Sequence, residues 1–182
     1  MKKKIVVFAG SECSPKREKY YYSLAYKTGK LLAEAGFTVV TGGGPGLMNE
    51  VSHGATDGGG KTVGVCLDIA GRTQSKYLSE KFMFTHLGPR QDKLLELGDG
   101  FLALPGGIGT LHEVVAVLAL KRKNEIPPNK PLIIIDGYYQ EFRELLEKMQ
   151  QEGFITENLY SLFTMVKTPE EAIEKLKRIY EI

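Results

Sequence analysis

Short apolar runs alternate with longer amphipathic stretches along the whole of this 182-residue chain. Runs such as Phe101–Leu104 and Leu132–Ile135 are apolar throughout, which is typical of strands that are covered on both faces of a sheet. The alternation of these runs with helical patterns predicts an α/β fold, with a mostly parallel central sheet and helices on both faces. The length suits one domain with a sizeable core.

The boundaries of the expected elements come from hydrophobic spacing and from the glycines and prolines between the runs. The expected strands are Ile5–Ala9, Phe37–Val40, Thr62–Cys66, Lys81–Thr85, Gly100–Leu104, Pro131–Ile135 and Leu162–Val166. The expected helices are Tyr20–Ala35, one from Pro45 to the glycines Gly58–Gly60, Pro89–Leu97, Gly109–Lys123, Tyr139–Glu152 and Pro169–Ile182. In such sheets ligands bind beyond the carboxyl ends of the strands. This rule selects the loops Gly10–Pro15, Thr41–Met48, Cys66–Ser79 and Pro105–Thr110.

The loop Pro105–Thr110, "PGGIGT", lies between a predicted buried strand and a predicted helix. Glycines at such a junction let a ligand approach the backbone, and the helix that follows offers unpaired N–H groups and the positive end of its dipole. The pattern predicts a phosphate site, although a tight turn without a ligand is the alternative. This loop contains neither the Gly-Lys-Ser/Thr of a Walker loop nor the GxGxxG of a dinucleotide site. A mononucleotide is therefore a better expectation than NAD.

Two charged residues lie on either side of this loop in the sequence, Arg90 fifteen positions before Pro105 and Glu113 three positions after Thr110. Glu113 falls within the first turns of the predicted helix, where the dipole favours an ionised carboxylate. It could face a pocket and stabilise positive charge, or it could be a surface residue that complements the dipole. Arg90 begins the preceding helix, and its guanidinium suits phosphate or carboxylate recognition, although a solvated surface arginine would have the same local pattern. His112 is expected to be a bystander, because adjacent helix residues do not share a face.

Charge and composition exclude several classes of function. Lys and Arg total 24 against 22 Asp and Glu, a balance that favours neither a nucleic-acid nor a membrane partner. No run approaches the length of a membrane span, and the first apolar run is shorter than a signal peptide requires. Cys13 and Cys66 suggest neither a disulfide framework nor a zinc site, so a reducing cytoplasm is expected. The isolated histidines His53 and His86 give no metal-ligand spacing.

Two segments resemble a known family when they are taken together. "GGGPGLM" at Gly42–Met48 and "PGGIGTLHE" at Pro105–Glu113 are similar to the paired signatures GGGxxGLM and PGGxGTxxE of the LONELY GUY (LOG) family. Its members are cytokinin-activating nucleoside 5′-monophosphate phosphoribohydrolases, long labelled lysine decarboxylases. The resemblance extends over nearly the whole chain and includes "DGGGKTVGV" at Asp57–Val65 and "PLIIIDGYY" at Pro131–Tyr139.

The resemblance implies a Rossmann-like three-layer fold, one nucleotide-binding domain over residues 1–182, and a homodimer. It implies hydrolysis of a nucleoside monophosphate such as AMP or an N6-substituted AMP, without a metal or other cofactor. Arg90 and Glu113 match the family's catalytic pair. The residues implied in phosphate and substrate binding are Gly10, Ser11, Gly43, Gly44, Met48, Gly106, Gly107, Ile108, Gly109 and Thr110.

Three departures from the family pattern bear on the preferred base. The first glycine loop is one residue shorter, and Gln91 and His112 stand where a lysine and an acidic residue are usual. A non-catalytic carrier is the alternative function, because a sister group of the same superfamily carries the molybdenum cofactor on similar loops. A pyridoxal-phosphate decarboxylase is a poorer option, since it needs a Schiff-base lysine and neither glycine loop contains one.

Overall fold

The structure is a computed structural model that describes residues 2–135 and 137–182. Its centre is a seven-stranded sheet in the order β4-β3-β2-β1-β5-β6-β7, and every neighbouring pair of strands is parallel. The strands are β1 (Lys4–Phe8), β2 (Thr38–Thr41), β3 (Thr62–Leu67), β4 (Glu80–Phe84), β5 (Gly100–Ala103), β6 (Leu132–Ile135) and β7 (Thr164–Val166). Met1 of the expected domain and Asp136 of the segment Pro131–Tyr139 lie outside the described residues.

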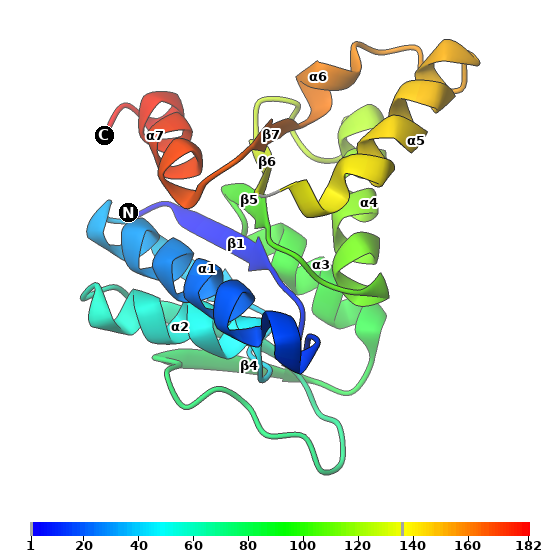
Figure 1. The fold of residues 1–182 in the computed structure, drawn as a ribbon. Helices are drawn as coiled ribbons and strands as arrows, with labels where there is room; N and C mark the ends of the chain where they lie inside the picture. Colours follow the sequence, from blue (N-terminus) through cyan, green and yellow to red (C-terminus); the bar gives the residue numbers. More distant parts are fainter. Residues whose placement is uncertain (1, 136) are drawn as a thin grey trace.

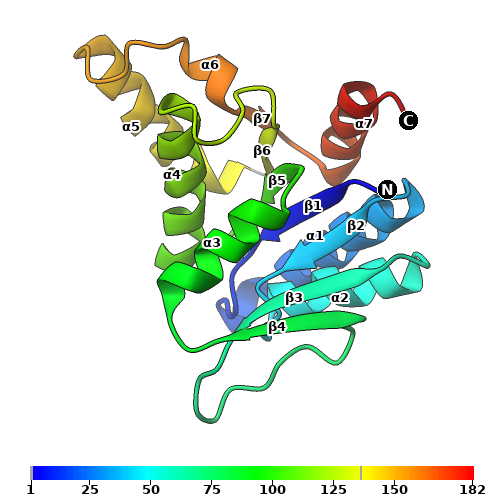
Figure 2. The same cartoon turned by 180° about the vertical axis from the view of Figure 1, so that it is seen from behind.

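Helices cover both faces of this sheet (Figures 1 and 2). They are α1 (Pro15–Glu34), α2 (Leu47–Asp57), α3 (Leu87–Leu97), α4 (Ile108–Arg122), α5 (Gln140–Gln151), α6 (Leu159–Leu162) and α7 (Pro169–Tyr180), with a 3₁₀ turn at Gly137–Tyr139 before α5. Helices α1, α2 and α7 pack on one face, and α3, α4 and α5 pack on the other. The predicted Rossmann-like, three-layer α/β class is confirmed.

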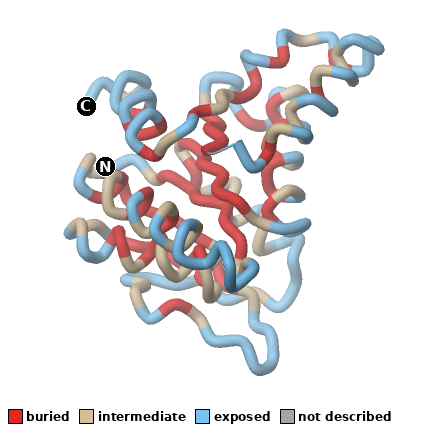
Figure 3. The backbone as a smooth tube through the Cα atoms, in the orientation of Figure 1, coloured by how far each residue is buried: buried red, intermediate tan, exposed pale blue. Residues whose placement is uncertain are grey.

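Alternate residues of each central strand enter opposite halves of the core. In β1, Ile5 and Val7 join the cluster under α1 and α2, while Val6 and Phe8 join the cluster under α3 and α4. All four side chains are at most 2% exposed, and Figure 3 shows the buried centre of the sheet. The unbroken apolar runs of the sequence therefore mark strands that are covered on both faces.

The order of the strands locates the functional edge of the sheet. Strand β1 pairs with β2 on one side and with β5 on the other. After β1 the chain continues to β2 on one side of the sheet, and after β5 it continues to β6 on the other side, so the direction of the connections reverses between β1 and β5. In open α/β sheets the crevice beyond the carboxyl ends of such a strand pair binds ligands. The loops after β1 and β5 meet there, because the Gly10 N–H donates to the Pro105 carbonyl oxygen at 3.1 Å.

The largest differences from the sequence expectations lie at element ends. Helix α1 begins at Pro15 rather than Tyr20, since proline is accepted at the first helical position even though polar residues follow it. Helix α2 begins at Leu47 rather than Pro45, because Gly46 has a positive φ of 68°. The strand expected to begin at Leu162 begins at Thr164. The residues before it form the short helix α6, where the Asn158 side chain accepts from the Tyr160 N–H.

Candidate active site

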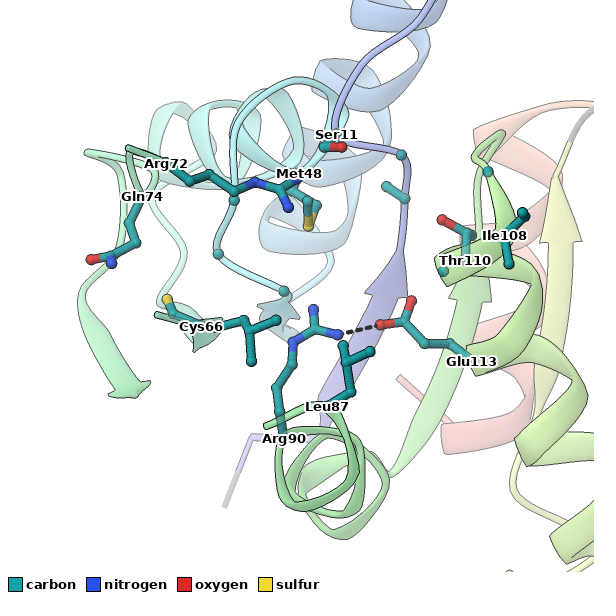
Figure 4. A pocket seen from close by; sticks show the side chains of 18 of the residues that line it. Ser11, Met48, Cys66, Arg72, Gln74, Leu87, Arg90, Ile108, Thr110 and Glu113 are labelled. Carbon is teal, nitrogen blue, oxygen red and sulfur yellow. Dashed lines mark hydrogen bonds and ion pairs between the residues drawn. The ribbon is translucent and has the colours of Figure 1, made fainter. Parts of the chain in front are cut away.

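A cavity of about 370 Å³ opens at this carboxyl edge, between the loops that follow β1, β2, β3 and β5 (Figure 4). It brings together nearly all of the residues that the sequence singled out. Those that line it are Gly10, Ser11, Gly43, Gly44, Met48, Arg90, Gly107, Ile108, Gly109, Thr110 and Glu113. The sheet topology thus gathers side chains that are up to about a hundred positions apart in the sequence.

Arg90 and Glu113 form an ion pair inside the cavity. The Arg90 Nη1 donates to the Glu113 Oε1 at 2.7 Å, and the Arg90 Nε donates to the Val65 carbonyl oxygen at 3.0 Å. The two side chains are only 12% and 10% exposed. Because α3 supplies the arginine and α4 the glutamate, packing of these helices on the sheet holds the pair in position (Figure 4).

Glu113 therefore faces the cavity rather than the surface. The sequence suggested that the helix dipole keeps this carboxylate ionised, but burial in the structure acts in the opposite direction. Burial raises the pKa of the Glu113 carboxyl, while the Arg90 guanidinium and, more weakly, His112 act to lower it. A carboxylate of raised pKa that still has a cationic partner is suited to accepting a proton from water near neutral pH.

The start of α4 is open towards the cavity. Gly107 precedes the helix without a side-chain cap among the described residues, and the first intrahelical bond runs from the Leu111 N–H to the Gly107 carbonyl oxygen. The N–H groups of the first helical turn therefore lack helical partners. A Cβ atom added to Gly107 or Gly109 would meet no atom within 4 Å. This arrangement can accept an anion the size of a phosphate.

Gly106, which the resemblance implied in phosphate binding, does not line the cavity. A Cβ atom at this position would overlap the Thr110 hydroxyl oxygen and approach the Gly10 nitrogen to 2.9 Å. The Gly106 carbonyl oxygen instead accepts from the Tyr138 hydroxyl at 3.0 Å. Glycine is thus required here by the close contact between the loops that follow β1 and β5.

The loop after β2 is tightly packed around the ion pair. A Cβ atom on Gly42 would overlap the Arg90 guanidinium, and one on Gly43 would overlap the Cys66 sulfur. Gly43 also has a positive φ of 65°, which disfavours other residues. Its N–H donates to the Thr41 hydroxyl at 3.1 Å, so the turn is held by its own strand.

The cavity is also lined by residues that the sequence analysis did not assign to the site individually. They are Ala9, Gly42, Cys66, Leu67, Arg72, Thr73, Gln74 and Leu87. Arg72 and Gln74 belong to the loop between β3 and β4, which the strand-end rule selected without indicating which of its residues would line the cavity; Figure 4 shows the Arg72 guanidinium extending towards Met48. Cys66 is buried, and burial raises the pKa of its thiol. His112 is exposed and does not line the cavity.

Comparisons with known proteins agree with this picture. The sequence model of the family described as "Possible lysine decarboxylase" matches residues 48–176. The probable cytokinin riboside 5′-monophosphate phosphoribohydrolase LOGL2 of Oryza sativa subsp. japonica is 32% identical over 182 residues, covering 96% of this chain and 72% of its own length. The cytokinin riboside 5′-monophosphate phosphoribohydrolase LOG4 of Arabidopsis thaliana is 30% identical, covering 96% of this chain and 81% of its own.

The solved structures include a different kind of protein with the same fold. The molybdenum cofactor binding protein of Rippkaea orientalis superposes with a TM-score of 0.74 at 25% identity, over 99% of this chain and 98% of that one.

Within residues 2–135 and 137–182, none of the helices is both long and apolar enough to cross a membrane.

Proposed function

This chain belongs to the LONELY GUY (LOG) family, and from that premise we propose that it hydrolyses the N-glycosidic bond of a nucleoside 5′-monophosphate. The substrate would be AMP or an N6-substituted AMP such as a cytokinin ribotide, and the products would be the free base and ribose 5-phosphate. The observation that carries the proposal is the buried Arg90–Glu113 pair beside an open, glycine-rich helix start.

The geometry suggests how the substrate would bind. The 5′-phosphate would accept hydrogen bonds from the backbone at Gly107, Gly109 and Thr110, at the positive end of α4. Glu113 lies one helical turn beyond Gly109, so the ribose would extend from the phosphate towards the ion pair. Gly44 and Met48 would border the base side of the cavity. Binding of the phosphate, which does not react, would hold the ribose in place for the reaction.

The reaction requires charge stabilisation at the sugar. As the bond from C1′ to the base nitrogen breaks, the ribose gains oxocarbenium character. The Glu113 carboxylate would stabilise this charge and accept a proton from the water whose oxygen bonds to C1′. Overall the elements of one water are added, the hydroxyl to C1′ and a proton to the departing base. The Arg90 guanidinium would hold the carboxylate ionised and oriented, because it donates to Oε1 directly.

The test is a panel of nucleoside monophosphates incubated with the protein, with the free bases measured by chromatography. Glu113→Gln keeps the size of the side chain and removes its charge, so kcat should fall by about 10²-fold or more. Glu96→Gln is the matched control, since Glu96 is an exposed glutamate of α3 that pairs with Lys93 and does not line the cavity. An unchanged rate in Glu113→Gln would contradict the proposed role of this residue.

A non-catalytic carrier is the second candidate, because the neighbour from Rippkaea orientalis is named as a molybdenum cofactor binding protein. It predicts binding of a phosphorylated pterin and no release of base from any nucleotide of the panel. A decarboxylase, as the family description suggests, is not supported. None of the described residues that line the cavity is a lysine, which a pyridoxal-phosphate enzyme needs for its Schiff base.

We also propose a homodimer formed by the outer face of α4 and α5. An apolar groove of about 390 Å³ lies there, and Arg122 is the one charged residue among the described residues that line it. Val115, Leu145 and Phe154 are 43%, 48% and 76% exposed, and such clustered apolar exposure is typical of protein interfaces. Light scattering should give twice the chain mass, and Phe154→Glu should give the monomer mass.

A further inference from the structure

A second polar cavity, of about 310 Å³, lies beside the amino ends of β6 and β7, whereas the candidate active site lies beyond the carboxyl ends of the strands. Its lining includes Leu132 and Thr164, with which β6 and β7 begin, Lys121 from the last turn of α4, and Lys175 from α7. Figure 1 shows the end of α4, the start of β6 and helix α7 at the opposite end of the molecule from the loop between β3 and β4. The two cavities are therefore separate.

The charge of this cavity is one-sided. Lys121, Lys130, Lys175 and Arg178 line it, and none of the described lining residues carries a carboxylate. Arg178 pairs with Glu174 on its own helix, and the Lys130 Nζ donates to the Gly98 carbonyl oxygen at 2.7 Å. Within the described part of the chain, Lys175 has no ion pair. The walls thus present excess positive charge, contributed by two helices and a loop.

Lys121 is the most unusual of these residues, because its side chain is buried. The residue is only 4% exposed, and its Nζ donates to the Leu162 carbonyl oxygen at 2.6 Å. An ammonium group has three N–H donors, and this contact uses one of them. Burial without a carboxylate partner lowers the pKa of Lys121. A buried cation of this kind is costly unless an anion compensates it.

A purely structural role does not account for the whole arrangement. Lys121 caps the carboxyl end of the short helix α6, whose last residue is Leu162. This cap explains one hydrogen bond of Lys121, but it leaves the convergence of Lys175 and Arg178 on the same space unexplained. We propose that the cavity binds the phosphate group of a small anion, with Lys121 at its base and Lys175 and Arg178 at its sides.

The choice of phosphate follows from charge and size. Several cations favour a doubly charged anion over a single carboxylate. Hydrogen bonds between ionised groups are also stronger than hydrogen bonds between neutral groups. The volume exceeds that of bare phosphate and falls at the lower end of the range for small-molecule sites. Tyr160, Pro128 and Ile179 line the remaining space and could contact a small organic portion of the ligand. A phosphate monoester such as a sugar phosphate has this chemistry.

The test is an NMR titration of the full chain at constant ionic strength. Glucose 6-phosphate and inorganic phosphate are the two probes, and glucose is the neutral control. We expect saturable shifts of the backbone amides of Ser161, Thr164 and Ile179, which lie around the second cavity. Tighter binding of glucose 6-phosphate would identify a monoester site, and equal binding would identify a site for free phosphate. Shifts confined to the amides of Gly107 and Gly109 would overturn the proposal.

Charge-removing variants separate binding from folding. Lys175→Gln should weaken the titration of the Ser161 and Thr164 amides about tenfold, while Lys177→Gln, an exposed neighbour on α7 that does not line the cavity, should not. Lys121→Met should abolish these shifts, and Lys175→Gln decides the matter if the Lys121 variant does not fold. Equal affinities of Lys175→Gln and Lys177→Gln would overturn the proposal. Base release from a nucleotide should be unaffected by Lys175→Gln, so this test is independent of the proposed hydrolysis.

Discussion

The two glycine-rich loops of the candidate active site use glycine for different reasons. In the loop after β2, protein atoms already occupy the space where side chains would be. A Cβ atom on Gly43 would overlap the Cys66 sulfur, and one on Gly46 would overlap the Ser11 carbonyl oxygen. Both residues also have positive φ values, of 65° and 68°. Both the crowding and the backbone conformation therefore favour glycine strongly in this loop.

The loop after β5 shows the opposite situation at its helix start. Gly107 and Gly109 border the cavity, and a Cβ atom on either would meet no atom within 4 Å. Their φ values are not in the left-handed region, so the fold itself would accept alanine. The comparison teaches that space is filled at the first loop and kept free at the second, which is where a ligand would be bound.

The largest expected effect is on stability and comes from Gly46→Ala. The added methyl would overlap the Ser11 carbonyl oxygen, and the positive φ disfavours alanine. We expect the free energy of unfolding to fall by about 2–4 kcal/mol, measured by urea denaturation. Gly59→Ala is the control for φ alone, because Gly59 has a φ of 72° with no atom within 4 Å of an added Cβ. If both variants lost equal stability, backbone strain rather than crowding would explain the loss.

The fold could be predicted from the sequence because burial on both faces leaves a clear pattern. Each expected strand overlaps an observed one, and β6 shows why, since all four of its residues are buried and apolar. Helix ends were harder to predict, because backbone geometry such as the positive φ of Gly46 decides them. Helix α6 was missed because four residues are too few to show helical spacing.

Local sequence pattern alone predicted the candidate site only where backbone geometry defines it, and Arg90 and Glu113 were assigned through the family resemblance. Glycine patterns identified both loops, since glycine is the residue that such turns require. The contact between Arg90 and Glu113 depends on how α3 and α4 each pack on the sheet, and it has no local signal in the sequence. Arg72 and Gln74 lie in an irregular loop, where no periodicity indicates which side chains turn towards the cavity.

The second expected effect is on substrate affinity and comes from Gly109→Ala. Alanine is favoured over glycine inside a helix, so the variant should be as stable as the natural chain or up to about 1 kcal/mol more stable. The same methyl would occupy the open space proposed for the phosphate, and KM for the nucleotide should rise about tenfold or more. Denaturation and steady-state kinetics measure the two quantities. A stable variant with unchanged KM would show that the space beside Gly109 is not used.

The smallest expected effect tests the link between the loops, since the Arg90 guanidinium packs on Gly42 and bonds to Glu113. Gly42→Ala would displace the guanidinium, which acts to lower the pKa of the Glu113 carboxyl. The pKa, already raised by burial, should therefore rise further, by up to about one unit. If the ionised carboxylate is the active form, the acidic limb of the plot of kcat/KM against pH should move to higher pH. Gly44→Ala is the control, because its methyl would meet only the flexible end of Met48 closely. A limb that moves equally in both variants, or towards lower pH in Gly42→Ala, would contradict a role for Arg90 in keeping Glu113 ionised.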